Sequence, residues 1–77
     1  MKKLKWKPTQ GLIARVGDMT AADPYSDLMF YSVYQGIELT TFFWYRTLPG
    51  EEVRATKCSS IKDGIKQAEV DFKERHK

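Results

Sequence analysis

Two long apolar-rich runs on either side of Gln35-Gly36 constrain the fold of this chain more than any other feature. The runs extend over residues 27–47, and glycine can adopt the positive φ that a tight hairpin turn requires. We therefore expect an antiparallel hairpin with Gln35 and Gly36 as its two-residue loop. That register pairs Tyr34 with Ile37, Ser32 with Leu39, Phe30 with Thr41 and Leu28 with Phe43.

The pairing divides the hairpin into two faces, because successive side chains of a strand point to opposite sides. The first face carries Leu28, Phe30, Ser32, Tyr34, Ile37, Leu39, Thr41 and Phe43. The second carries Met29, Tyr31, Val33, Glu38, Thr40, Phe42, Trp44 and Arg46. A slip of one residue would exchange the two faces.

Weaker patterns predict the remaining strands. Apolar and other side chains alternate well enough over residues 12–16 to indicate a first strand, which glycines bound on both sides. Residues 19–26 are typical of a connecting loop. Pro49 and Gly50 favour a type II turn over residues 48–51, after which residues 52–57 return as a further strand.

The apolar period changes near residue 60 and predicts a C-terminal helix. Ile61, Ile65, Ala68 and Phe72 fall on one stripe at about 100° per residue. Ser60 and Asp63 form a capping box in which Asp replaces the usual Glu or Gln. Gly64 lies beside the stripe, where the absence of a side chain favours close approach to the sheet.

Together these elements predict an α+β fold: an antiparallel three- to four-stranded sheet with one C-terminal helix packed on one face. At 77 residues the chain is expected to form a single domain. Its parts are a basic N-terminal arm over residues 1–9, the sheet over 10–57 and the helix over 60–76.

Charge is unevenly distributed along the chain. Residues 1–17 carry five basic side chains and no acid, residues 18–52 carry six acids against Arg46 alone, and residues 53–77 carry seven bases against four acids. The single cysteine allows no intrachain disulfide, and no apolar run has the length of a signal peptide core or of a membrane span. We therefore expect a cytoplasmic protein with no membrane association.

The sequence offers little for catalysis. Cys58 and His76 are the only Cys and His, and they bracket a helix whose length keeps them apart, although a thiol before a helix N-terminus can have a lowered pKa. No set of three or four metal ligands and no glycine-rich phosphate loop is present. We expect no enzymatic activity, no cofactor and no metal.

The aromatic content of the hairpin indicates an interaction surface. One helix shields one sheet face, and the first face is the more apolar candidate for that contact. The second face is then open to a protein partner or to a second copy of the chain, unless the N-terminal segment with Leu4 and Trp6 folds across it. The predicted partner-binding residues are Met29, Tyr31, Val33, Phe42, Trp44 and Arg46.

Nucleic-acid binding is the alternative. Basic arms attract phosphates, and exposed sheet aromatics stack on bases. The residues that this reading selects are Lys2, Lys3, Lys5, Trp6, Lys7, Arg15 and Arg46. The acidic middle of the chain argues against it, because a continuous basic stripe is the usual pattern.

Three features give the chain a family resemblance: the Lys5-Trp6-Lys7 opening, the aromatic hairpin and the Ser-led helix that starts at Ser60. In these it resembles small accessory proteins encoded by bacteriophages and prophages, which implies a host-modulating or accessory role. It is also similar to the arm-type DNA-binding domain of tyrosine recombinases, in which a three-stranded sheet precedes a helix. The Thr40-Thr41-Phe42-Phe43 run departs from the basic sheet of that family, so no functional residue is carried over.

Overall fold

The computed structural model describes residues 2–9, 17–26, 28–38, 40–47, 50 and 53–76. Within them the chain forms five strands and one helix. The elements are β1 (Lys7–Pro8), β2 (Met19–Ala22), β3 (Phe30–Gln35), β4 (Phe42–Arg46), β5 (Thr56–Cys58) and α1 (Ile61–Arg75). The predicted strand over 12–16 and most of the predicted turn over 48–51 lie outside the described residues.

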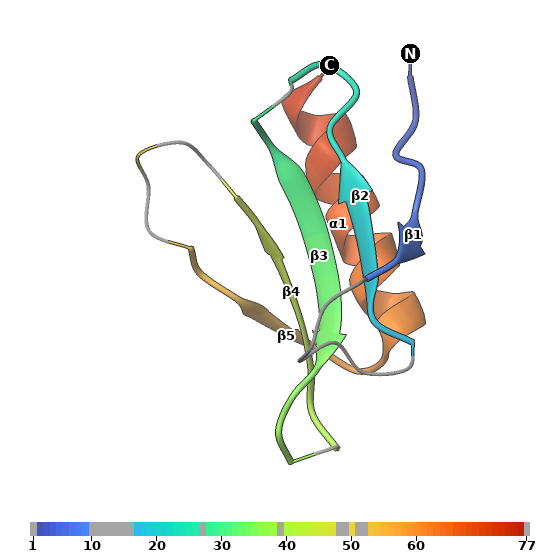
Figure 1. Cartoon of the computed structure of the whole chain (residues 1–77), viewed down its shortest axis with the longest axis vertical. Helices are drawn as coiled ribbons and strands as arrows, with labels where there is room; N and C mark the ends of the chain where they lie inside the picture. The colour runs from blue at the N-terminus through green and yellow to red at the C-terminus, as the bar shows by residue number, and fades with distance from the viewer. Residues whose placement is uncertain are drawn as a thin grey trace.

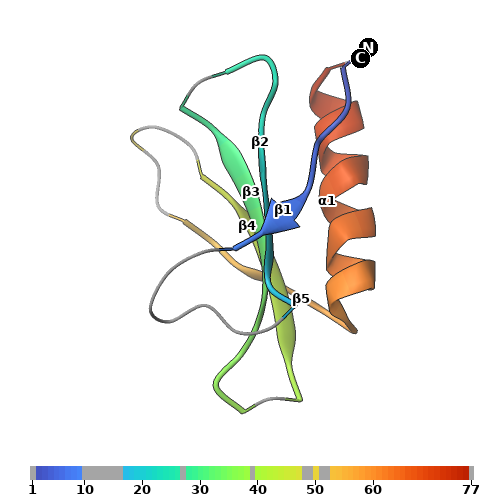
Figure 2. The same ribbon diagram turned by 45° about the vertical axis from the view of Figure 1, so that its right-hand side comes forward.

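The five strands form one antiparallel sheet in the order β1-β2-β3-β4-β5, so each strand pairs with its neighbour in sequence. Helix α1 lies along one face of this sheet and runs beside the N-terminal segment (Figures 1 and 2). The α+β class and the single C-terminal helix are thereby confirmed, with five strands where three to four were expected. Two of them were not predicted, since residues 7–8 were assigned to the basic N-terminal arm and residues 19–22 to a loop.

The pairing of the central hairpin differs from the prediction. Tyr34 pairs with Phe43 rather than with Ile37, six residues earlier, and the loop closes with a hydrogen bond from Gly36 N to Thr41 O at 2.7 Å. Because the shift is an even number of residues, each strand residue keeps its predicted face. Positive φ angles are found at Gly17 and Gly50, and Gly36 is not among them. Glycine fits this position because space is tight, since a Cβ there would lie 3.1 Å from the ring of Phe43 and 3.3 Å from Thr41 O.

The core lies between α1 and the sheet. Its buried members are Leu4, Ala21, Tyr31, Ala68 and Phe72, with Trp6 and Trp44 packed against them. Ala68 and Phe72 confirm the inner part of the predicted stripe, whereas Ile61 and Ile65 lie at its margin and are half-buried. The helix is turned so that Gly64 faces the sheet. A Cβ on Gly64 would come within 2.5 Å of a Val33 methyl group, which confirms the predicted close approach.

The helix begins as its sequence predicts. Ser60 is the N-cap, and its hydroxyl accepts a hydrogen bond from Asp63 N at 3.0 Å. The Asp63 carboxylate accepts in return from Ser59 N at 2.9 Å, so the capping box reaches one residue further back than usual. At the other end, His76 N donates to Phe72 O and closes the last turn. These bonds satisfy backbone groups that a helix end otherwise leaves unpaired.

Candidate nucleic-acid interface

The face that we expected to be open lies beneath the helix. Tyr31 and Val33 are completely buried, and Trp44 packs against the core while its indole Nε1 donates to Gln67 Oε1 of α1 at 2.9 Å. Met29, just before β3, and Phe42, at the start of β4, are half-buried. The set Met29, Tyr31, Val33, Phe42, Trp44 and Arg46 is therefore not an open partner-binding surface. The helix and the N-terminal segment with Leu4 and Trp6 cover its central residues Tyr31, Val33 and Trp44.

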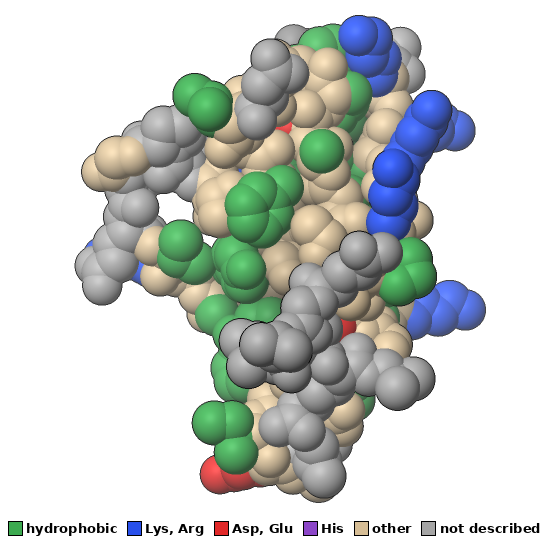
Figure 3. All heavy atoms as spheres, viewed as in Figure 1, with side chains coloured by type: hydrophobic (Ala, Val, Ile, Leu, Met, Phe, Trp, Pro, Cys, Tyr) green, Lys and Arg blue, Asp and Glu red, His purple; other side chains and the backbone are tan. Residues whose placement is uncertain are grey.

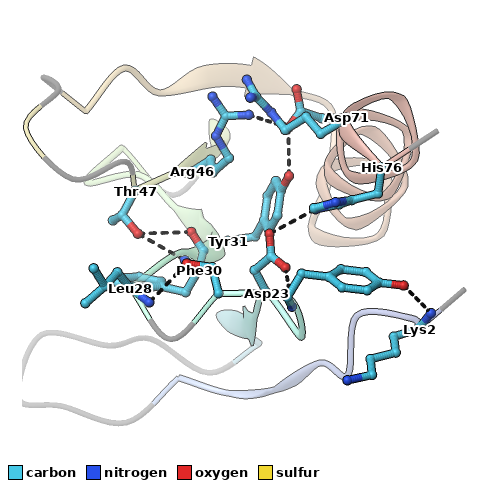
Figure 4. A network of polar contacts seen from close by, with 12 residues as sticks. Lys2, Asp23, Leu28, Phe30, Tyr31, Arg46, Thr47, Asp71 and His76 are labelled. Carbon is cyan, nitrogen blue, oxygen red and sulfur yellow. Dashed lines mark hydrogen bonds and ion pairs between the residues drawn. The ribbon is translucent and has the colours of Figure 1, made fainter.

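A carboxylate from α1 links the helix to this face of the sheet. One oxygen of Asp71, Oδ2, accepts hydrogen bonds from the Tyr31 hydroxyl at 2.8 Å, from Arg46 Nη1 at 3.1 Å and from Arg75 Nε at 3.1 Å (Figure 4). Burial and the bond to Asp71 raise the pKa of Tyr31 well above its usual value. Arg46, selected by the sequence as a partner or phosphate contact, is thus committed to an ion pair between sheet and helix.

A second polar link fixes the end of the helix to the segment between β2 and β3. Asp23 is buried, and its carboxylate accepts from Tyr25 N at 2.8 Å and lies 3.2 Å from His76 Nε2 (Figure 4). The ring of Tyr25 lies against Phe72 and His76, and its hydroxyl accepts from Lys2 N at 2.8 Å. The N-terminal segment is therefore held beside α1.

The opposite side of the sheet, which we call the open face, carries a row of aromatic rings. Its strand residues are Lys7, Thr20, Ala22, Phe30, Ser32, Tyr34, Phe43, Tyr45 and Lys57, as the pairing dictates. Phe30 and Tyr45 pack edge to face at 6.3 Å, Tyr45 and Tyr34 do the same at 5.8 Å, and Tyr34 and Phe43 stack at 5.6 Å. Burial raises the pKa of the Tyr34 hydroxyl, and the neighbouring Tyr45 adds to this effect.

A hollow of about 1280 Å³ lies on this face, between the rings and the N-terminal segment. Thr20, Ala22 and Ser32 form its floor, Phe30 and Tyr45 form one wall, and the opposite wall carries Lys3, Lys5 and Lys7. Lys2 also borders the hollow, but its ammonium lies over the Tyr25 ring, 5.7 Å from the ring centroid. We call this hollow the lysine groove. Figure 3 views the open face and shows hydrophobic side chains over the sheet, with Lys and Arg side chains along the β1 edge.

The lysine wall arises from alternation in the N-terminal segment. Leu4 is buried in the core and Trp6 packs against it, whereas Lys3, Lys5 and Lys7 are exposed and line the groove. This is the period of two that an extended strand imposes. Trp6 therefore does not belong to the basic surface to which the sequence assigned it.

Acidic side chains are absent from the strand residues of the open face. Asp18 precedes β2 on the same side, but it is buried, and its Oδ1 accepts a hydrogen bond from Gln35 N at 3.0 Å. Lys57 of β5 lies opposite Phe43 in the sheet and adds a further cation on the far side of the ring row. The open face therefore combines rings with positive charge.

Other candidate chemistry in the described residues is limited. Cys58 is buried, and burial and the nearby Asp63 raise the pKa of its thiol, contrary to the lowering that a helix N-terminus can produce. No group of three or more His, Cys, Asp or Glu in the described part of the chain is placed to hold a metal ion. None of the helices described here is long and apolar enough to cross a membrane.

Of the nucleic-acid residues selected by the sequence, Lys2, Lys3, Lys5 and Lys7 come together at the groove. Arg46 and Trp6 turn toward the helix side instead, and Arg15 lies outside the described residues. Sequence reasoning missed both rings, since it placed Phe30 on the face beneath the helix and assigned Tyr45 to neither face. The alternation of Lys with Leu4 and Trp6 is the sequence signal that predicts an edge strand here. It also predicts that the lysines lie on the side of the sheet opposite Leu4 and Trp6.

A scan of protein-family models, a search of curated proteins and a search of solved structures find no match to this chain.

Proposed function

We propose that this protein is a non-catalytic nucleic-acid-binding module whose binding surface is the open face. The observation that carries the proposal is the lysine groove, in which Lys3, Lys5 and Lys7 lie across a small-residue floor from the rings of Phe30 and Tyr45. Nucleic acid offers both complements at once, since its phosphates attract cations and its bases stack on aromatic rings. The expected accessory role of phage type would be exercised through such binding.

The charge of the open face favours nucleic acid over a second copy of the chain as its ligand. Self-association through the open face would bring two sets of lysines together, with no acidic side chain on the strand residues to offset them. Juxtaposed like charges disfavour an interface. The exposed apolar residues elsewhere, such as Ile37 and Leu28, are of the scattered kind that soluble proteins tolerate.

A protein partner is the second candidate, and the half-buried stacked pair of Tyr34 and Phe43 beyond the groove favours it. Aromatic residues are enriched in interface cores. Such a partner would need acidic side chains to face the lysines. Sedimentation velocity of the purified protein, alone and with a polyglutamate chain, separates a dimer and an acidic-protein binder from a nucleic-acid binder.

The decisive experiment is the salt dependence of binding to fluorescently labelled oligonucleotides, measured by anisotropy between about 50 and 200 mM salt. Substitution of Lys5 and Lys7 by Ala is expected to weaken binding and to reduce the slope of log K against log salt by about 1.4, since each phosphate contact of a single strand contributes about 0.7. The matched control is Lys62→Ala with Lys66→Ala, which removes the same charge from exposed positions on α1.

The control pair is expected to leave the slope nearly unchanged. Loss of affinity of equal size in both double variants would show that only net charge matters and would remove the groove from the proposal. Absence of measurable binding at low salt would remove nucleic-acid binding altogether.

A further inference from the structure

Resting on the proposed function, we infer that the lysine groove accepts an unpaired nucleic-acid strand rather than a duplex, with its phosphates on the lysine wall and its bases on Phe30 and Tyr45. Charge alone does not distinguish a single strand from a duplex, because both carry phosphates.

The aromatic wall makes the distinction. In a duplex the faces of the bases are covered by stacking, and only base edges are accessible in the grooves. Rings on the surface of a sheet offer flat apolar area, which is complementary to the face of a base and not to its edge. Phe30 and Tyr45 are therefore suited to stack on the bases of a single-stranded nucleic acid, because those bases are not held in a duplex.

The rings are held ready for such a contact. Phe30 is 37% exposed, and its edge-to-face packing with Tyr45 at 6.3 Å fixes the two rings relative to each other. Tyr34 continues the same arrangement beyond Tyr45 at 5.8 Å, so the aromatic surface extends past the groove. A surface that is ordered before binding loses little conformational entropy when a ligand arrives.

The floor leaves room between the two walls. It is formed by Thr20, Ala22 and Ser32, whose side chains are small, and it spans β2 and β3. Since neighbouring strands lie about 4.8 Å apart, the backbones of β1 and β4 are separated by roughly 14 Å across this floor.

The floor also has a polar group to offer. The hydroxyl of Thr20 is bonded to that of Thr9 at 2.6 Å, whereas the Ser32 hydroxyl forms no hydrogen bond within the described residues. Ser32 is only 6% exposed, so its hydroxyl is a small polar spot in the floor and the main contacts of a ligand fall on the two walls. One backbone lying along the floor has the cations on one side and the rings on the other.

The test compares labelled oligothymidylate and oligouridylate of about 12 nucleotides with a hairpin duplex of similar charge, by anisotropy at one salt concentration. The single strands are expected to bind at least about tenfold more tightly than the duplex. Phe30→Ala and Tyr45→Ala are each expected to weaken single-strand binding by roughly tenfold, with the salt slope unchanged, whereas Tyr45→Phe keeps the ring and the affinity.

Ser32→Leu provides an independent variant, because it fills the floor without removing a ring or a lysine, and it is expected to block the single strand. Circular dichroism of each variant establishes that it is folded. Duplex binding as tight as single-strand binding, or affinity that survives both ring substitutions, would overturn the inference while leaving salt-dependent nucleic-acid binding in place. Failure of every oligonucleotide to bind would overturn the proposed function itself.

Discussion

Gly64 is the residue at which the helix and the sheet come closest. A Cβ at this position would lie 2.5 Å from Val33 Cγ1 and 2.9 Å from Cys58 Sγ, and Val33 is completely buried. The contact explains why a residue with poor helix propensity occupies the second turn. Glycine in a helix costs about 1 kcal/mol relative to alanine, and the close packing that it allows between helix and sheet offsets this cost.

Gly64→Ala is accordingly expected to destabilise the protein by about 1–3 kcal/mol despite the better helix propensity of alanine, because overpacking a core displaces its neighbours. Urea denaturation measures the difference. Combination with Val33→Ala removes the clashing methyl groups, so the glycine-to-alanine change should cost less in that background. An increase in stability for Gly64→Ala alone would contradict the close approach.

Asp71 is the second residue on which the contact of helix and sheet depends. Replacement by Ala leaves the Tyr31 hydroxyl and the Arg46 guanidinium without their carboxylate partner. We expect a loss of about 2 kcal/mol or more, since an unsatisfied buried polar group costs about 1–3 kcal/mol. Tyr31→Phe should cost only about 1 kcal/mol, because it removes a single neutral donor.

A double-mutant cycle between these two positions checks the link directly by chemical denaturation. The double variant Tyr31→Phe with Asp71→Ala should be more stable than the sum of the single losses implies. Strict additivity of the two changes would show that the hydrogen bond contributes nothing to stability.

At the scale of the element, the start of α1 carries a pH dependence. Hydrogen bonds from Ser59 lower the pKa of Asp63 below its ordinary value of 3.8. A carboxyl group whose pKa is lowered on folding stabilises the protein above its unfolded pKa, and this stabilisation is lost as the pH falls through the folded value. The relevant range therefore lies below about pH 4.

Asp63→Asn is expected to be less stable than the parent at neutral pH, with a difference that shrinks as the pH falls through that range. Urea midpoints measured from neutral pH to about pH 2.5 test this. Ser60→Ala is the comparison variant, since it removes the cap but keeps the carboxylate, and its loss should persist at neutral and acidic pH. A difference for Asp63→Asn that is constant with pH would contradict the role of the charge.

The strands show which parts of the fold local sequence determines. The helix and its cap follow from a period and a pair of residues that are close in the chain, and both were predicted. The register of the hairpin was not, because it depends on whether Phe43 or Ile37 packs beside Tyr34, and that choice is made by ring contacts across the sheet. Ile37, which the short loop would have placed in a strand, is 90% exposed.

The choice of sheet face failed for a related reason. The sequence favoured the first face partly because Ile37 was counted on it, and Ile37 is 90% exposed. With β2 included, the helix face gains Ala21 and the N-terminal segment adds Leu4, so the balance reverses. Because β2 and β1 are short and carry few strand-forming residues, their contribution becomes visible only after the sheet is assembled.

For the whole molecule, one helix gives the sheet two unlike sides. The helix side is closed by core packing and by the carboxylates of Asp71 and Asp23, whereas no helix of the described chain lies over the rings of the open face. The sequence predicted that one face of the sheet has no helix over it, and in the structure this is the face that carries Phe30, Tyr34, Phe43 and Tyr45. The lysines of the groove were identified from composition, and their aromatic counterparts required the structure.

The same N-terminal segment contributes side chains both to the lysine groove and to the core. Lys5 and Lys7 hold one rim of the surface, while Leu4 and Trp6, on the reverse of the same short stretch, are anchored inside. Deletion of these residues would therefore remove core side chains together with the lysines. Substitutions that remove only the lysine charges are needed to separate loss of binding from loss of stability.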